Sequence, residues 1–135
     1  MKKKVLFICE ANACRSQIAE ALMRIKYSDK FIAFSAGTHQ SNAVNPVAIK
    51  IIKDKYGYDM IEEGQHTKSA DDIMLEFDAV VNIGNSDFSI KKPKYYEEWD
   101  LTQIEEPTYE VLSKIISNIE DKIDKFVEKI EKGSK

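Results

Sequence analysis

The stretch KVLFICEANACRSQIAEAL, residues 4–22, decides the fold of this chain because its pattern changes partway along. Residues 4–9 form a largely apolar run rich in β-formers, which is typical of a strand covered on both faces. From Ser16 onward, apolar residues recur at helical spacing as far as Ile25. The stretch therefore predicts a buried strand, a short loop and a helix, with Cys9 at the carboxyl end of the strand.

The same alternation of strands and helices continues to the end of the chain. We expect strands at residues 31–35, 77–83 and 95–99, and helices at residues 45–57, 69–76 and 111–130. Such a pattern predicts an α/β fold of three layers, in which helices cover both faces of a four-stranded parallel sheet. Ligands of these sheets bind beyond the carboxyl ends of the strands, which is where Cys9 is expected.

The composition indicates one ordinary globular domain spanning residues 1–135. Hydrophobic residues make up 43% and charged residues 32%, and the formal charge of −3 argues against nucleic-acid binding. No apolar stretch is long enough to span a membrane, and the apolar run before Cys9 is too short for a signal peptide. We therefore expect a cytoplasmic monomer with no membrane or nucleic-acid partner. The cytoplasm would keep its two cysteines reduced.

The loop between the first strand and the first helix has the chemistry of an oxyanion site. Backbone N–H groups at such a helix start converge on one point, and the helix dipole adds partial positive charge. The same field favours the thiolate of Cys9, which becomes a nucleophile. Arg15 can hold two oxygens of the anion, Ser16 can donate a hydrogen bond to the sulfur, and Asn12 can shape the loop. The predicted binding residues are Glu10, Ala11, Asn12, Ala13, Cys14, Arg15 and Ser16.

CEANACRSQIAEA, residues 9–21, resembles the phosphate-binding loop and first helix of two related groups of enzymes. They are the low-molecular-weight protein tyrosine phosphatases and the thioredoxin-coupled arsenate reductases that share their fold. The likeness extends to residues 35–38, to Asn45 and Pro46, and to residues 77–81. The resemblance implies a flavodoxin-like fold in which Cys9 attacks phosphorus or arsenic while the loop binds the oxyanion. It implies phosphate, arsenate or a phosphorylated substrate as the ligand, and no required cofactor.

The phosphatases also use an acid in a late loop, usually an Asp before a Pro, and residues 104–109 resemble that stretch. Glu106 is the matching position, so the resemblance makes it the residue that protonates the leaving oxygen and later activates water. Glu105 and Asp100 are nearby alternatives, and Tyr109 is expected to flank the pocket mouth.

Three functions stay open at this point. A phosphatase needs nothing more than the site described so far, whereas an arsenate reductase needs a second thiol. The thioredoxin-coupled reductases carry that cysteine just after the third strand, where this chain has Gly84. A reductase would therefore need an external thiol or would use Cys14, which could also form a protective disulfide with Cys9. Glu10 and Ala11 depart from the usual loop, and they motivate a third reading, a phosphate-binding module without catalysis.

Two further roles are expected for residues around the loop, namely support of the loop and binding of a cation. His66 could support the loop by holding Asn12. Asn12, Glu20 and Ser35 together resemble a potassium site of some reductases. With two histidines and no Cys-x-x-Cys pair, the sequence predicts no transition-metal site.

Overall fold

The computed structural model describes residues 2–73, 76–84, 92–101 and 108–133. Its centre is a four-stranded sheet with the strand order β2-β1-β3-β4. The strands are β1 (Lys3–Cys9), β2 (Phe31–Gly37), β3 (Ala79–Ile83) and β4 (Tyr95–Trp99). All neighbouring strands are parallel. The structure therefore confirms the predicted sheet, including the strand at residues 95–99.

β1 lies inside the sheet and is buried on both faces. Val5, Phe7 and Cys9 belong to the larger core cluster, whereas Leu6 and Ile8 belong to a smaller cluster on the opposite face. All five side chains are at most 2% exposed. Because both faces are covered, the run that predicted this strand shows no alternation of polar and apolar residues.

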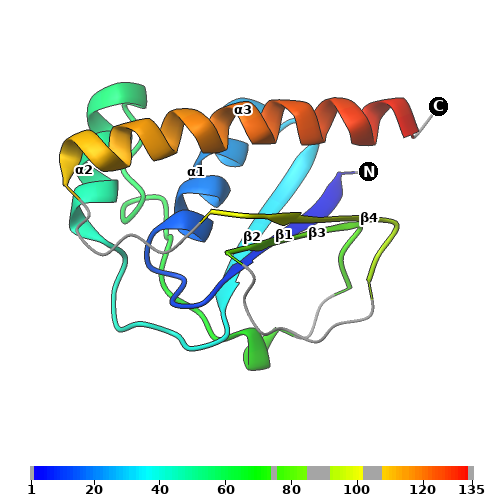
Figure 1. The fold of residues 1–135 in the computed structure, drawn as a ribbon, viewed down its shortest axis with the longest axis horizontal. Coiled ribbons are helices and arrows are strands. Elements are labelled where there is room, and N and C mark those ends of the chain that lie inside the picture. Colours follow the sequence, from blue (N-terminus) through cyan, green and yellow to red (C-terminus); the bar gives the residue numbers. More distant parts are fainter. Residues whose placement is uncertain (1, 74–75, 85–91, 102–107, 134–135) are drawn as a thin grey trace.

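Helices cover both faces of the sheet, as predicted, but unequally (Figure 1). On one face, α1 (Arg15–Tyr27) packs on β1 and β2, and α2 (Pro46–Tyr56) and α3 (Tyr109–Gly133) pack against it and each other. On the other face, a single 3₁₀ helix, Ala70–Asp72, stands where the sequence predicts a helix at residues 69–76. Residues 74–75 of that prediction lie outside the described residues.

α3 is the long amphipathic helix expected at residues 111–130. Its apolar face consists of Leu112, Ile116, Ile119, Ile123, Phe126, Val127 and Ile130, all of them buried. The Phe126 ring lies 6.3 Å from that of Trp99, which in turn lies 5.9 Å from the ring of Phe7. These aromatic contacts tie α3 to β4 and β1. No helix in the described part of the chain is long and apolar enough to cross a membrane.

The start of α2 is set by a side-chain cap. The Asn45 carbonyl oxygen Oδ1 accepts hydrogen bonds from the N–H groups of Val47 at 2.8 Å and Ala48 at 3.3 Å. Pro46 is the first helical residue, where a missing N–H costs nothing. Asn45 therefore fixes the point at which the segment after β2 turns into a helix.

Candidate active site

The loop of residues 10–14, between β1 and α1, is held by the segment that follows β2. Four backbone N–H groups of that segment donate to carbonyls at the loop: Thr38 to Cys9 at 3.2 Å, His39 to Glu10 at 2.7 Å, Ser41 to Ala11 at 2.9 Å and Asn45 to Ala13 at 2.7 Å. In a trans peptide the N–H points away from the preceding C=O. The N–H groups that follow these carbonyls therefore face the other side, where the Cys9 sulfur lies and an oxyanion can bind.

Asn12 makes the tight turn of the loop with a φ of +55°. Asparagine is one of the few residues besides glycine that adopt this left-handed conformation readily. Gly37, at the end of β2, lets the loop pack this closely. A Cβ at Gly37 would stand 2.7 Å from the Glu10 carbonyl oxygen and 2.9 Å from the Cβ of Asn12. Gly37 is therefore required because a side chain there would collide with the loop, and not because of the conformation of its strand.

The Cys9 thiol lies at the base of the loop with two donors beside it. Its sulfur is 2.8 Å from Ser16 Oγ and 3.2 Å from the backbone nitrogen of Asn12. The Asn12 side-chain amide donates to the same Ser16 oxygen at 2.8 Å, which leaves the hydroxyl proton of Ser16 for the sulfur. Both groups, and the start of α1, thus lie directly against the Cys9 sulfur.

Arg15 is the first residue of α1 and is 6% exposed. Its Nη1 donates to the backbone carbonyl of Leu101, just after β4. Gly84, just after β3, has a φ of +73°, and a Cβ there would stand 2.1 Å from Nη1. The space that a side chain at Gly84 would need is therefore filled by the Arg15 guanidinium.

A buried pair of amide side chains supports the loop from below. Gln17 Nε2 donates to the backbone oxygen of Asn12 at 3.1 Å and to that of His66 at 2.8 Å. Gln65 Nε2 donates to Gln17 Oε1 at 2.8 Å. The imidazole of His66 is exposed and lies beside the Gly64 carbonyl instead of Asn12, which corrects the expected contact; His66 supports the loop through its backbone oxygen, which accepts from Gln17.

Glu20 and Ser35, two residues of the potassium hypothesis, lie together beneath the loop. Ser35 Oγ donates to Glu20 Oε1 at 2.6 Å, and both residues are at most 1% exposed. Two cationic side chains of the chain itself approach this carboxylate: Arg24 at 2.8 Å and Lys68 at 3.8 Å. Within the described residues, no group of three or more His, Cys, Asp or Glu side chains is placed to hold a metal ion.

Cys14 differs from Cys9 in its surroundings. It precedes α1 without capping it, and its side chain packs against the larger core cluster. Burial, with a smaller contribution from the nearby Cys9, raises the pKa of Cys14 to about 12, although Arg15 opposes the shift. Cys14 therefore stays a protonated thiol at neutral pH.

The remaining predicted residues lie around the rim or outside the described ranges. Glu10 is exposed, so its carboxylate lies outside the core of the loop. Asp100 is exposed just after β4, and Tyr109 opens α3 with its hydroxyl donating to Asp54 at 3.0 Å. Glu105 and Glu106 lie outside the described residues, so their role stays a prediction.

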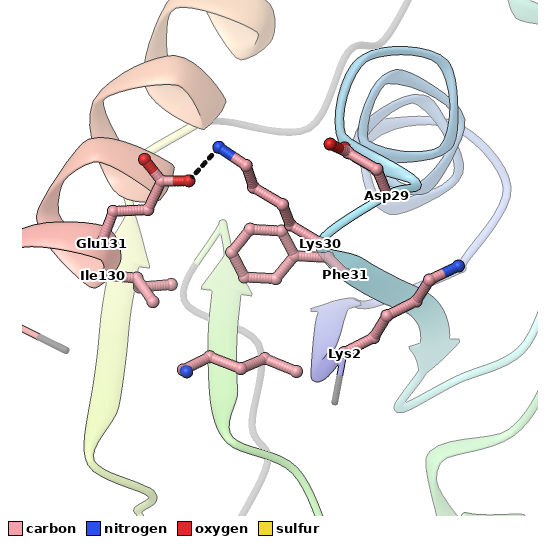
Figure 2. A pocket seen from close by; sticks show the side chains of 7 residues that line it. Lys2, Asp29, Lys30, Phe31, Ile130 and Glu131 are labelled. Carbon is pink, nitrogen blue, oxygen red and sulfur yellow. Dashed lines mark hydrogen bonds and ion pairs between the residues drawn. The ribbon is translucent and has the colours of Figure 1, made fainter.

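A cavity of about 430 Å³ lies at the other end of the sheet (Figure 2). It is lined by Lys2, Lys3, Asp29, Lys30, Phe31, Ile130 and Glu131. Lys3 and Phe31 begin β1 and β2, whereas Cys9 ends β1. Cys9 comes six positions after Lys3 in the same strand, a span of roughly 20 Å. The cavity is therefore remote from the nucleophile.

Two curated relatives are arsenate reductases. The chain is 39% identical to arsenate reductase 1 of Staphylococcus epidermidis over 84 residues, which are 61% of this chain and 60% of that protein. It is 25% identical to the glutaredoxin arsenate reductase of Synechocystis sp. over 133 residues, which are 95% of this chain and 98% of that protein.

Solved structures share the fold along nearly the whole chain. An arsenate reductase in the phosphate binding state matches with a TM-score of 0.78 and 26% identity, covering 96% of this chain and 99% of that one. The low molecular weight protein tyrosine phosphatase from T. tengcongensis matches with a TM-score of 0.78 and 22% identity, covering 95% and 99%, which shows the fold alone.

The loop, its cysteine and its arginine thus stand in a fold that phosphatases and arsenate reductases share. The model of one protein family matches residues 4–135, which include the whole loop and every strand except the first residue of β1. This chain belongs to the low molecular weight phosphotyrosine protein phosphatase family of cysteine-dependent enzymes.

Proposed function

We propose that this protein hydrolyses phosphomonoesters through a cysteinyl-phosphate intermediate on Cys9. The observation that carries the proposal is the Cys9 sulfur, held 2.8 Å from Ser16 Oγ and 3.2 Å from the Asn12 nitrogen at the base of an anion-binding loop. This chemistry needs a free thiol and no cofactor, which suits the reducing cytoplasm. The exposed carboxylate of Glu10 at the rim favours small or basic substrates over acidic phosphopeptides.

The reaction has two displacement steps at phosphorus. The Cys9 thiolate attacks, an S–P bond forms, and the P–O bond to the leaving group breaks. Arg15 has five N–H donors, so those not used by Leu101 can hold the equatorial oxygens together with the loop N–H groups. Glu106, as the proposed acid, gives its proton to the leaving oxygen. Water then attacks phosphorus and gives a proton to the Glu106 carboxylate, the S–P bond breaks, and inorganic phosphate leaves as the Cys9 thiolate returns.

Arsenate reduction with an external thiol is the second candidate, favoured by the arsenate reductases among the relatives. The Cys9 thiolate would attack arsenic and displace water. A small thiol would then attack the Cys9 sulfur, the As–S electron pair would reduce As(V) to As(III), and arsenite would leave. A second thiol would release Cys9 from the mixed disulfide. An external thiol is necessary because Cys14 stays protonated and because the position after β3 is Gly84, which has no thiol.

Hydrolysis of p-nitrophenyl phosphate, compared between wild type, Cys9→Ser and Cys14→Ser, tests the proposal. We expect turnover that Cys9→Ser abolishes and Cys14→Ser retains, and that Glu106→Gln lowers by roughly a hundredfold. The same preparations are then given arsenate with glutathione and glutaredoxin.

The outcomes separate the candidates. Arsenite release without ester hydrolysis would replace the phosphatase by the reductase. If neither reaction occurs while phosphate still protects Cys9 from alkylation, the protein binds anions without turnover. In that case the loop is a phosphate-binding module, and the proposal of hydrolysis fails.

A further inference from the structure

Glu20 is a buried carboxylate beneath the active-site loop. It belongs to α1, and its side chain is 1% exposed. A buried charge is tolerated only where opposite charges and hydrogen bonds compensate the lost water. Its Oε2 pairs with Arg24 at 2.8 Å, and its Oε1 accepts the Ser35 hydroxyl at 2.6 Å. The carboxylate therefore has a cation at Oε2 and a neutral donor at Oε1.

Lys68 supplies a positive charge on that side. Its Nζ lies 3.8 Å from Glu20 Oε1 and donates to the backbone oxygen of His66 at 2.6 Å. The side chain is 23% exposed. Burial lowers the pKa of Lys68, and the charge of Glu20 acts against that decrease. The ammonium group thus lies beside two oxygen atoms of the chain, Glu20 Oε1 and the His66 carbonyl oxygen.

The same residue touches the loop through its backbone. The N–H of Lys68 donates to Asn12 Oδ1 at 2.8 Å, and the Asn12 amide donates in turn to Ser16 Oγ at 2.8 Å. Ser16 Oγ lies 2.8 Å from the Cys9 sulfur. A chain of hydrogen bonds therefore runs from Lys68 to the nucleophile. A shift of Lys68 would be transmitted to the Cys9 thiol.

We propose that Lys68 is a positioning residue whose ammonium group acts as a built-in cation beneath the loop. It adds a second positive charge beside Glu20 and holds the segment whose backbone N–H binds Asn12, so the site needs no bound monovalent cation in its place. Its role in turnover rests on the proposed function, whereas its role in loop order and Cys9 reactivity does not.

The test is to remove the ammonium and offer a cation from solution. In Lys68→Ala, Glu20 Oε1 and the His66 oxygen lose their cation but keep space for a potassium ion, which is close in size to an ammonium group. Tetramethylammonium is too large to enter. The melting temperature and the rate of Cys9 alkylation are measured in potassium chloride and in tetramethylammonium chloride at equal ionic strength.

We expect wild type to behave alike in both salts. In tetramethylammonium chloride, Lys68→Ala should melt lower by roughly 3–8 °C and react severalfold more slowly at Cys9. Potassium should restore at least half of each loss, and Lys68→Arg should need no potassium. The matched control is Lys50→Ala, which removes a lysine that is 67% exposed and pairs with Asp54 at 3.4 Å. The melting temperature and the rate of Cys9 alkylation of Lys50→Ala should be the same in both salts.

Three results would overturn the proposal: a wild type that itself gains stability from potassium, a Lys68→Ala protein that potassium does not restore, or one whose Cys9 reacts at the wild-type rate. None of these readouts requires turnover. If p-nitrophenyl phosphate is not hydrolysed by any variant, the proposed function fails while the role of Lys68 is still decided.

Discussion

Gly84 makes room for Arg15: a Cβ on this glycine would stand 2.1 Å from the Nη1 atom of the guanidinium and 2.9 Å from the Leu101 carbonyl oxygen. The arginine proposed to bind the oxyanion is thus positioned by Gly84, the residue after β3, and by Leu101, two residues past β4. Its placement depends on the ends of two strands that are distant in sequence from the loop.

Gly84→Ala should therefore lower catalysis more than stability. The methyl group displaces the guanidinium, and we expect turnover to fall by roughly tenfold to a hundredfold, because misplaced charge stabilises the transition state poorly. Its φ of +73° adds a loss of about 1 kcal/mol in unfolding free energy. The kinetics of p-nitrophenyl phosphate and a urea unfolding curve measure the two effects.

Gly57→Ala is the matched control. Gly57 has a φ of +68°, and nothing lies within 4 Å of a Cβ built there. It should lose a similar unfolding free energy and keep full turnover. Equal turnover losses in both variants would show that backbone strain, and not the contact with Arg15, is responsible.

Ser16→Ala should slow the alkylation of Cys9. The substitution removes the hydroxyl 2.8 Å from the sulfur and leaves the buried Asn12 amide without its acceptor. We expect iodoacetamide to react severalfold more slowly at pH 7, and turnover to fall by roughly tenfold. Ser16→Thr keeps the hydroxyl and should retain more reactivity than Ser16→Ala. Equal rates in wild type and Ser16→Ala would contradict a role for the hydroxyl.

Cys14 should be nearly inert beside Cys9. Burial raises its pKa to about 12, so its thiolate fraction is negligible near neutral pH and grows only in strong alkali. Mass spectrometry after a short alkylation at pH 7 should find the label on Cys9, and phosphate should protect that site. Rapid labelling of Cys14 in the folded protein would contradict the expectation.

A second network, remote from the loop, should make stability depend on pH. Lys26 Nζ lies 2.7 Å from Asp124 and 3.0 Å from Glu120, and the Tyr27 hydroxyl donates to Asp124 at 2.6 Å. Burial alone would raise the pKa of Asp124, but its hydrogen bonds to Lys26 and Tyr27 outweigh that effect and hold it below the usual value. The stability is therefore present above the unfolded pKa, about 4, and is lost as pH falls through the lower folded pKa.

Lys26→Met tests this network. We expect a loss of about 1 kcal/mol at pH 7, because the three charged side chains are a quarter to two fifths exposed and solvent screens them. The difference from wild type should shrink as the pH is lowered past the folded pKa of Asp124. Lys114→Met removes a 79% exposed lysine 4.0 Å from Glu110. It should lose almost no unfolding free energy, both at pH 7 and at the lowered pH. A difference that stays constant with pH would contradict the assignment.

Local patterns predicted most of the fold. The apolar run at residues 4–9, the cap at Asn45 and Pro46, and the apolar face of residues 111–130 each arise from interactions within one element. Within the described part of the helix expected at residues 69–76, the chain forms a 3₁₀ turn at Ala70–Asp72, in which the Ser69 side chain accepts a hydrogen bond from the Asp71 N–H. Short-range hydrogen bonds of this kind compete with an α-helix and give no periodic signal.

The nucleophile and the arginine were predictable, because a strand, a loop and a helix in succession bring them together. The residues that support the loop from beneath were not predictable. Gln65 and Lys68 lie about fifty residues further along the chain, in a polar stretch that has the composition of a solvated loop. Only the folded chain shows that Gln65 is 3% exposed and that Lys68 faces a buried carboxylate.

The four hydrogen bonds from residues 38–45 to the carbonyls at the loop have a consequence for folding. Because these carbonyls are held by N–H groups of that segment, the loop cannot adopt its shape until β2 has paired with β1 and brought the segment alongside. A nascent chain that ends before Thr38 therefore carries an ordinary, unactivated Cys9. Reactivity at this residue appears only after long-range order does, which makes the rate of thiol alkylation a reporter of refolding.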